Sequence, residues 1–468
     1  MRFKRIICLA LCMASLICPV TVLGEKEENS SFSMQGGSHS IDAQTPILGS
    51  EQLIKNAEAV LLYEVKTDTL MYAWNADKPV YPASLVQIMT ALLVIEKGNL
   101  KEAVTVSQEA LESVGRGAAS VGLKKDEVMS AEDLLNCMLV DSANDAAAVL
   151  AEHVSGSQSA FVARMNQRAQ ELGCTSTNFV NSTGLHDTNQ VTTARDLCRI
   201  LTEAIKHDEF RKPFGTVTCK TAPTNQSEER KLETGNFLMN WYSMEIYYDP
   251  RVTGGRTGVT QDGNRCIAAT AEQDDLSFIS IVMGAASEYE EEGNKVKSFG
   301  GFPETTQLLD MGFKKYKPAG IIYENQTLRQ YPVINGSSDV FVCPRVMIST
   351  VLPFGTDTKD LTYRYREREP QFTAPIQKGE SMGSVEIWND GICIGQAELF
   401  AMNKVDVKES PMTEENIQQE RQPVSQSTWI IVGIAGFVIL AFFLRKLMLY
   451  RKKSAVRRRN SQNRRRSR

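Results

Sequence analysis

YPASLVQIMTALLVIEKGN (residues 81–99) places a serine at the expected start of a buried helix. Pro82 favours helix entry, and the apolar residues after it recur at helical spacing until Gly98 closes the run. Ser84 stands where a serine either caps a helix or acts as a nucleophile. The nucleophilic interpretation needs a base one helical turn later, but that residue is Gln87, and an amide is not a base.

Both ends of the 468-residue chain carry membrane-related signals. Residues 1–24 combine a basic start with an apolar stretch, which predicts a secretory signal peptide, with an uncleaved anchor as the alternative. Residues 429–450 begin with the uncharged run WIIVGIAGFVILAFFL and predict a transmembrane segment, with a helix lying on the membrane as the alternative. The basic tail, residues 451–468, then lies in the cytoplasm, and the chain before the transmembrane segment lies outside the cytoplasm.

Composition and charge narrow the class of protein. The chain is 42% hydrophobic and 23% charged, which is typical of globular proteins. Its formal net charge is −4, although the residues after 444 hold twelve Lys or Arg and no acid, so the rest is acidic. An acidic ectodomain gives no electrostatic case for a nucleic-acid partner.

Cysteines and histidines give no sign of a metal site. Seven of the ten cysteines lie outside the expected signal peptide, widely spaced and without a CxxC pair. We expect isolated buried thiols, with at most one disulfide that the spacing cannot assign. The four histidines are scattered, so we expect no metal site. The sequence implies no organic cofactor either.

The chain between the two ends divides into two folded parts. Residues 25–50 predict a disordered lead-in. Residues 51–315 read as strands, then helices, then strands again with a last helix over 294–316, which predicts an α/β (α+β) body with helices packed on one sheet. Residues 319–408 predict a small all-β domain. Residues 409–428 form a polar linker.

Two short motifs in the helical part could carry chemistry. Ser84 and Gln87 share one helix face, one turn apart. Ser142 and Asn144 lie in VDSAND, at a break between two expected helices. Such a corner can point both side chains at a pocket, although Asn144 or Asp145 would also serve simply as a helix cap.

A third motif is GGRTGVT, residues 254–260. Gly258 would let the backbone approach a ligand closely. Arg256 and the Thr257 hydroxyl could hold a carboxylate, since guanidinium suits planar two-point contacts. The alternative is a glycine-rich turn with a solvated arginine. Any one of the three motifs is short enough to recur by chance.

Together and in this order, the motifs resemble the Ser-x-x-Lys, Ser-x-Asn and Lys-Thr-Gly signature of penicillin-binding proteins and serine β-lactamases. YPASLVQIMTALL, LLNCMLVDSANDAAAVLAEHV and NFVNSTGLHDTNQVTTARDL are similar to stretches of the low-molecular-mass D-alanyl-D-alanine carboxypeptidases. PIQKGESMGSVEIWNDGICIGQAELFA resembles the C-terminal β-domain of that family. The resemblance covers roughly residues 50–408.

The resemblance implies a β-lactamase/transpeptidase-like body in a bacterial, extracytoplasmic protein. Its substrate would be the peptidoglycan stem peptide ending in D-Ala-D-Ala, and β-lactams would be further ligands. Ser84 would be the nucleophile that forms an acyl-enzyme, with Ser142 and Asn144 on the second wall. Arg256, Thr257 and Gly258 would form the strand that binds the substrate carboxylate.

The chain departs from that signature at two positions. Gln87 stands where the family has its lysine base, and positioned general-base catalysis contributes about 10²- to 10⁴-fold in rate. Arg256 replaces the lysine of Lys-Thr-Gly and keeps the positive charge, but it stays protonated and cannot serve as a base. Two hypotheses follow: a serine carboxypeptidase that trims D-Ala, and a catalytically silent relative that binds stem peptides or cell-wall partners. A β-lactamase activity is less expected, since it also needs fast deacylation.

Overall fold

The computed structural model describes residues 40–43, 46–115, 117–290, 295–409, 430–431 and 433–448. The expected signal peptide and basic tail, most of the expected lead-in and nearly all of the expected linker lie outside the described residues.

A five-stranded antiparallel sheet organises the first part of the chain, in the order β2-β1-β9-β8-β7. Its strands are β1 (Ala59–Glu64), β2 (Thr69–Trp74), β7 (Val252–Val259), β8 (Arg265–Gln273) and β9 (Leu276–Ala285). The first two strands thus share one sheet with three that come almost 180 residues later, and β1 pairs directly with β9. Strand β7 lies at the edge of the sheet and pairs only with β8 among the described strands.

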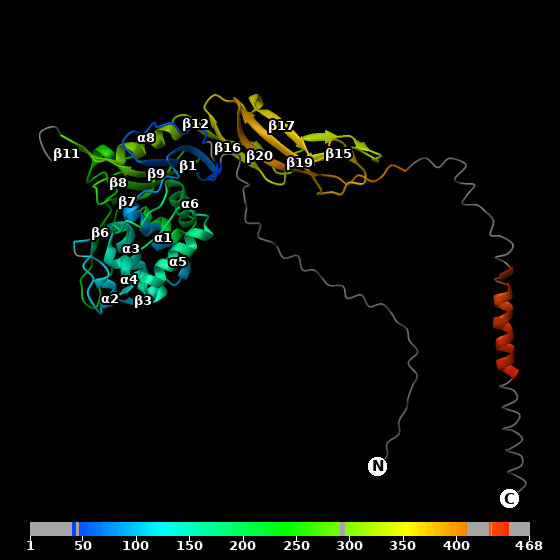
Figure 1. Ribbon diagram of the computed structural model, residues 1–468, viewed down its shortest axis with the longest axis horizontal. Helices are drawn as coiled ribbons and strands as arrows, with labels where there is room; N and C mark the ends of the chain where they lie inside the picture. The colour runs from blue at the N-terminus through cyan, green and yellow to red at the C-terminus, as the bar shows by residue number, and fades with distance from the viewer. Residues whose placement is uncertain are drawn as a thin grey trace, which may run out of the picture.

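Alternating side chains of β1 enter two different cores. Ala59, Leu61 and Tyr63 belong to the core shared with the helices, whereas Val60 and Leu62 face a second core. This follows from the two-residue period of a strand. The sheet is therefore covered on both faces, by a group of helices on one side and by α8 (Phe302–Phe313) on the other (Figure 1).

The helices on the first face lie between β2 and β7 in the sequence. They are α1 (Gln87–Lys97), α2 (Gln108–Glu112), α3 (Ala131–Asp141), α4 (Asn144–Ser155), α5 (Gln158–Glu171), α6 (Ala194–Ala204) and α7 (Asp208–Phe214). Short elements join them: the 3-10 turns η1 (Ala83–Val86) and η2 (Glu245–Tyr247), and the strands β3 (Ala103–Thr105), β4 (Val128–Ser130), β5 (Thr218–Lys220) and β6 (Lys231–Glu233). Nine residues of α1, Gln87 to Ile95, are buried, so this helix lies in the interior of the body.

The second part of the chain is all-β. Its main sheet has the order β13-β15-β20-β19-β17, formed by β13 (Arg329–Tyr331), β15 (Val340–Cys343), β17 (Thr362–Glu367), β19 (Ser381–Asn389) and β20 (Ile392–Ala401). Two smaller pairs are β12 (Tyr316–Ile322) with β16 (Ile348–Pro353), and β14 (Val333–Ile334) with β18 (Phe372–Thr373). These strands enclose a core of their own. The expectation of a mixed α/β body followed by a small all-β domain is confirmed.

The expected helix over 294–316 is only partly right. Its first described residues form β11 (Val296–Ser298), which pairs with β10 (Glu288–Tyr289), and the helix begins after Gly301. A side chain at Gly300 would meet the carbonyl oxygen of Ala286 at 2.3 Å, which explains the tight turn between strand and helix.

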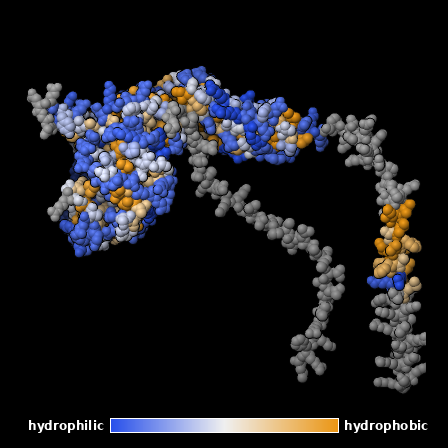
Figure 2. All heavy atoms as spheres, in the orientation of Figure 1, coloured by the Kyte–Doolittle hydropathy of each residue, from blue (hydrophilic) through white to orange (hydrophobic). Residues whose placement is uncertain are grey.

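Residues 430–431 and 433–448 are helical, and their large apolar side chains are exposed, as the orange colour in Figure 2 shows. Across the described part of the chain, however, none of the helices combines the length and the apolar character needed to cross a membrane. The transmembrane segment expected over 429–450 stays a prediction.

Candidate active site

Ser84 lies on the 3-10 turn η1, directly before α1. The turn begins after Pro82 without a side-chain cap, so the interpretation of Ser84 as a helix cap is wrong. Ala83 has a left-handed φ of 48°, which turns the chain sharply before the serine. Ser84 is half-buried, and its hydroxyl makes no hydrogen bond to any residue that the structure describes.

Two glycines allow the chain to close around Ser84. A Cβ atom on Gly258 would lie 2.6 Å from the backbone nitrogen of Ser84, and one on Gly184 would lie 2.8 Å from its Cα atom. Gly184 also has a left-handed φ of 90°. Strand β7 and the loop around residue 184 therefore pack directly against the serine turn, a contact that larger residues would prevent.

Gln87 lies one turn after Ser84 and is fully buried. Its side-chain nitrogen donates to Asn144 Oδ1 at 3.2 Å and to the carbonyl oxygen of Thr183 at 3.0 Å. Its side-chain oxygen accepts a hydrogen bond of 2.8 Å from Arg256 Nη2. Both amide hydrogens are thus committed to protein acceptors, and the oxygen already accepts from the Arg256 guanidinium, so the side chain has no group that could take a proton from Ser84.

Arg256 reaches from β7 into the interior of the site and is only 3% exposed. Besides Gln87, its guanidinium donates to the hydroxyl of Ser142 and, through Nη1, to the carbonyl oxygen of Leu139 at 3.2 Å. Its Nε atom is buried and has no partner among the described residues. The alternative of a solvated arginine on a glycine-rich turn is therefore wrong.

The corner that carries Ser142 and Asn144 forms between α3 and α4, as the sequence predicts. Ser142 ends α3 in the left-handed conformation, with φ of 64°, and Asn144 opens α4 without capping it through its side chain. Asn144 donates through Nδ2 to the carbonyl oxygen of Ala119 at 3.0 Å. The neighbouring Asp145 accepts hydrogen bonds from Ser120 and from the backbone of Leu123. This corner therefore also holds the loop that borders the site.

Thr257 and Gly258 lie on the edge strand β7. The Thr257 side chain is half-buried, and its hydroxyl has no partner among the described residues. Because β8 is the one partner of β7 among the described strands, the other edge of β7 leaves backbone N–H and C=O groups available to an extended peptide. The predicted nucleophile, second wall and substrate strand are thus brought together, and Gln87 and Arg256 join the walls by direct hydrogen bonds.

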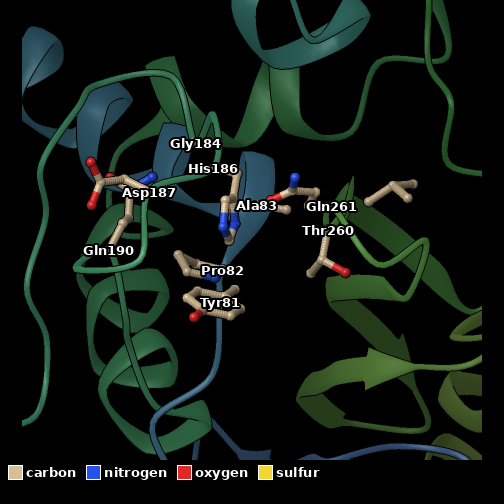
Figure 3. A pocket seen from close by; sticks show the side chains of 10 residues that line it. Tyr81, Pro82, Ala83, Gly184, His186, Asp187, Gln190, Thr260 and Gln261 are labelled. Carbon is tan, nitrogen blue, oxygen red and sulfur yellow. The ribbon is translucent and has the colours of Figure 1, made fainter.

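A small hollow adjoins the serine turn and has about 30 Å³ of space open to a water-sized molecule. Figure 3 shows it between the turn with Pro82 and Ala83, the loop with His186 and the chain after β7 with Thr260. The His186 ring packs edge-on against Tyr81, with the ring centroids 4.8 Å apart. The hollow reaches Ala83, the residue before Ser84, and has room for ordered water rather than for a peptide.

Electrostatics do not supply the missing base. Burial lowers the pKa of Arg256 to about 10, while the Asp141 carboxylate opposes the change, so the guanidinium remains protonated at neutral pH. Burial also raises the pKa of Asp141, against the effect of Arg256. Within the described residues, no carboxylate, imidazole or amine hydrogen-bonds to Ser84 or Ser142. The arrangement can bind and polarise a ligand, but it offers the serine no proton acceptor.

Sequence reasoning missed the backbone acceptors that complete the site. The carbonyl groups of Ala119, Leu139 and Thr183 accept hydrogen bonds from the three central side chains. Asn181 shapes the loop that carries Thr183, since its side chain accepts from the backbone of Gly184 at 2.8 Å. Only Asn181 has a side chain typical of such turns, and the carbonyl groups have no sequence signature.

The comparisons with known proteins agree with this geometry. The fold and the site define the transpeptidase-like class of penicillin-binding proteins. A profile described as D-alanyl-D-alanine carboxypeptidase matches residues 48–287, and one described as the C-terminal domain of penicillin-binding protein 5 matches residues 316–407. The chain belongs to the D-alanyl-D-alanine carboxypeptidase family, as the motifs suggested.

Several relatives support this assignment. The chain is 31% identical to D-alanyl-D-alanine carboxypeptidase DacC of Escherichia coli over 75% of this chain and 84% of that protein. It is 28% identical to DacF of Bacillus subtilis over 77% of this chain and 88% of that protein. The crystal structure of penicillin-binding protein 5 from Haemophilus influenzae matches with a TM-score of 0.61 and 27% identity, over 75% of this chain and 98% of that one.

Proposed function

We propose that this protein binds peptidoglycan stem peptides ending in D-Ala-D-Ala without hydrolysing them at an enzymatic rate. One observation carries the proposal: the Gln87 side chain is committed to Asn144, Thr183 and Arg256, in the position where the family has its base. Without a base, Ser84 stays a weakly nucleophilic hydroxyl. Membership in the carboxypeptidase family supports the choice of stem peptide as ligand.

The binding mode follows from the edge strand. A stem peptide would lie antiparallel or parallel to β7 and pair with its free backbone groups, as extended peptides do at exposed sheet edges. Its terminal carboxylate would approach the Thr257 hydroxyl and the positive charge of Arg256, while Gly258 keeps the strand close to Ser84. β-Lactams would enter the same space as non-covalent ligands.

A second candidate is a slow serine carboxypeptidase that forms an acyl-enzyme at Ser84. The presence of Ser84, Ser142 and Asn144 in the family order favours it. Here the loss of the lysine would be compensated by a group that approaches the serine only once substrate is bound.

We also propose that the protein is exported and anchored in a bacterial cell membrane, with the folded parts outside and the basic tail in the cytoplasm. The apolar helical residues 433–448 support this proposal, since nearly all of their large side chains are exposed. Residues 1–24 and 451–468 would supply the export signal and the orientation.

Release of D-alanine from a pentapeptide ending in D-Ala-D-Ala would test the function. The full chain in detergent would be compared with Ser84→Ala and Gln87→Lys, and peptide affinity would be measured in parallel. We expect the native chain to bind the peptide without releasing D-alanine. Release that disappears in Ser84→Ala would establish the carboxypeptidase instead, and absence of binding would reject both candidates.

A further inference from the structure

The loop between β6 and β7 exposes an unusual group of large apolar side chains. Trp241, Tyr242, Ile246 and Tyr248 are 48%, 77%, 81% and 43% exposed, within eight residues. The rings of Trp241 and Tyr242 lie against each other, with centroids 4.0 Å apart and planes 33° apart. We call these four residues the aromatic platform. Grouped exposure of this kind marks a binding surface more often than an accident of folding.

The loop beneath the platform is firmly held. Asn240 and Ser243 both donate to the Glu233 carboxylate, at 3.0 Å each. The Tyr247 ring packs on Phe302 with centroids 5.1 Å apart, and its hydroxyl accepts from the backbone of Phe299 at 2.8 Å. These hydrogen bonds and ring contacts hold the loop in place and leave the rings of the platform exposed.

The loop that carries the platform begins beside the substrate strand. The loop starts at Gly235, where an added Cβ would lie 3.9 Å from the Thr257 hydroxyl, and it runs directly into β7. Trp241 lies six positions after Gly235, a reach of at most about 22 Å. An extended pentapeptide spans about 17 Å, so the sugar that carries a bound stem peptide would lie within reach of the platform.

The charge of the loop narrows the class of ligand that the platform can bind. No Lys or Arg stands between Glu233 and Arg251. Glu233 and Asp249 are paired with Lys231 and Arg251, so the loop presents no excess of positive charge that would attract anionic lipid or nucleic acid. In Figure 1, β6 and β7 lie at the side of the body away from the all-β domain that leads to the apolar helix. A neutral ligand with flat apolar faces fits, and the C–H faces of pyranose rings stack on Trp and Tyr in this way.

We propose that the aromatic platform binds the β-1,4-linked N-acetylhexosamine backbone of peptidoglycan. The choice of glycan rests on the proposed binding of stem peptides at β7, because those peptides are attached to such strands. The platform would hold the glycan while its peptide enters the site beside Ser84. It thereby gives the protein a second contact with the cell wall that needs no chemistry at the serine.

The test uses the full chain in detergent and chitohexaose as the probe, with affinity measured by calorimetry. We expect the double variant Trp241→Ala/Tyr242→Ala to weaken binding at least tenfold, since both rings on which the sugars stack would be removed. The control is Tyr323→Ser, an aromatic 58% exposed in the all-β part, which should bind like the native chain. Circular dichroism would verify that each variant is folded.

The outcomes separate this proposal from the proposed function. If the native chain does not bind chitohexaose, or if the double variant binds it equally well, the platform is not a glycan site. Binding of zwitterionic vesicles or self-association that disappears in the double variant, without glycan binding, would also overturn the proposal. Affinity for the free D-Ala-D-Ala pentapeptide should be unchanged in the double variant. If the native chain binds chitohexaose but not the pentapeptide, the proposed function is rejected instead.

Discussion

Replacing Gln87 with lysine would put a second cation into the centre of the site. The Gln87 side-chain oxygen lies 2.8 Å from Arg256 Nη2, so an ammonium group there would lie about 4 Å from the guanidinium. At an effective dielectric constant of about 20, two unit charges at that separation repel by about 4 kcal/mol. That energy corresponds to a fall of about 3 units in the pKa of the lysine, from about 10.4 to about 7.4.

This shift predicts a gain of function with a characteristic pH dependence. Near pH 8 much of the introduced lysine would be neutral and could take the proton of Ser84. We expect covalent labelling of Ser84 by a fluorescent penicillin to become about 10²- to 10⁴-fold faster than in the native chain. The labelling rate should rise between about pH 6.5 and 8.5 and then level off.

The stability of the same variant should change with pH in a defined direction. The pKa of the lysine is lowered in the folded state, so between about pH 7.4 and 10.4 the unfolded chain binds more protons. The free energy of unfolding should therefore rise with pH across this window, relative to the native chain, and urea unfolding at pH 6 and pH 9 would measure it.

A matched control separates the base from the change in packing. Gln87→Met has a similar length but no proton acceptor, so it should perturb the site without accelerating labelling. Ser84→Ala combined with Gln87→Lys should not be labelled at all. The reasoning is refuted if Gln87→Met and Gln87→Lys are labelled at equal rates, or if labelling of Gln87→Lys does not vary from pH 6 to 9.

Three further predictions concern the surroundings of the serine. Gly258→Ala should lower the free energy of unfolding by about 1–3 kcal/mol and weaken peptide binding, because the added Cβ would meet the serine turn at 2.6 Å. The control is Gly115→Ala, which has open space around it. Equal effects of the two substitutions would contradict the argument. Asp145→Ala should lower the free energy of unfolding, measured by urea titration, by about 1–3 kcal/mol. It should also make the 118–123 segment easier to cleave by protease, because the backbone donors of that segment lose their acceptor. For Glu127, burial raises the pKa, but hydrogen bonds from Arg230 and Thr224 outweigh it and the net pKa is lowered. Its stabilising effect is thus present above pH ~4.3 and is lost as pH falls through the lowered pKa, so Glu127→Gln should flatten the acid side of the stability profile in urea titrations.

The sequence predicted which residues would meet but not how they would bond. The order of the three motifs was enough to place Ser84, Asn144 and Arg256 in one site, since the family resemblance supplied the fold. The bond between Gln87 and Arg256 joins residues 169 positions apart and depends on side-chain direction, which no local pattern encodes. The acceptors at Ala119 and Thr183 are backbone carbonyl groups, which every residue carries.

Local signals also failed where tertiary packing decided the outcome. Ser84 has the residue type of a helix cap, but the left-handed Ala83 before it makes a 3-10 turn in which its hydroxyl is left open. The expected helix over 294–316 begins only after Gly301, since the preceding residues pair as a strand with β10.

The two departures from the family signature are best understood as one change. A glutamine at position 87 with a lysine at 256 would leave the amide oxygen facing a flexible ammonium, which has no planar set of donors. Arginine instead has a rigid fork whose Nη atoms reach Gln87, Ser142 and Leu139 together. Conversely, a lysine at 87 beside Arg256 would introduce the repulsion worked out above. Gln87 and Arg256 therefore fit each other. The buried polar atoms of the pair are hydrogen-bonded, apart from the Arg256 Nε atom. The pair gives Ser84 no proton acceptor. A site that had merely lost its base would leave the Asn144 Oδ1 atom without its donor and Arg256 Nη2 without one of its acceptors, whereas here Gln87 bonds to both, which favours a stable binding cleft over a damaged catalytic one.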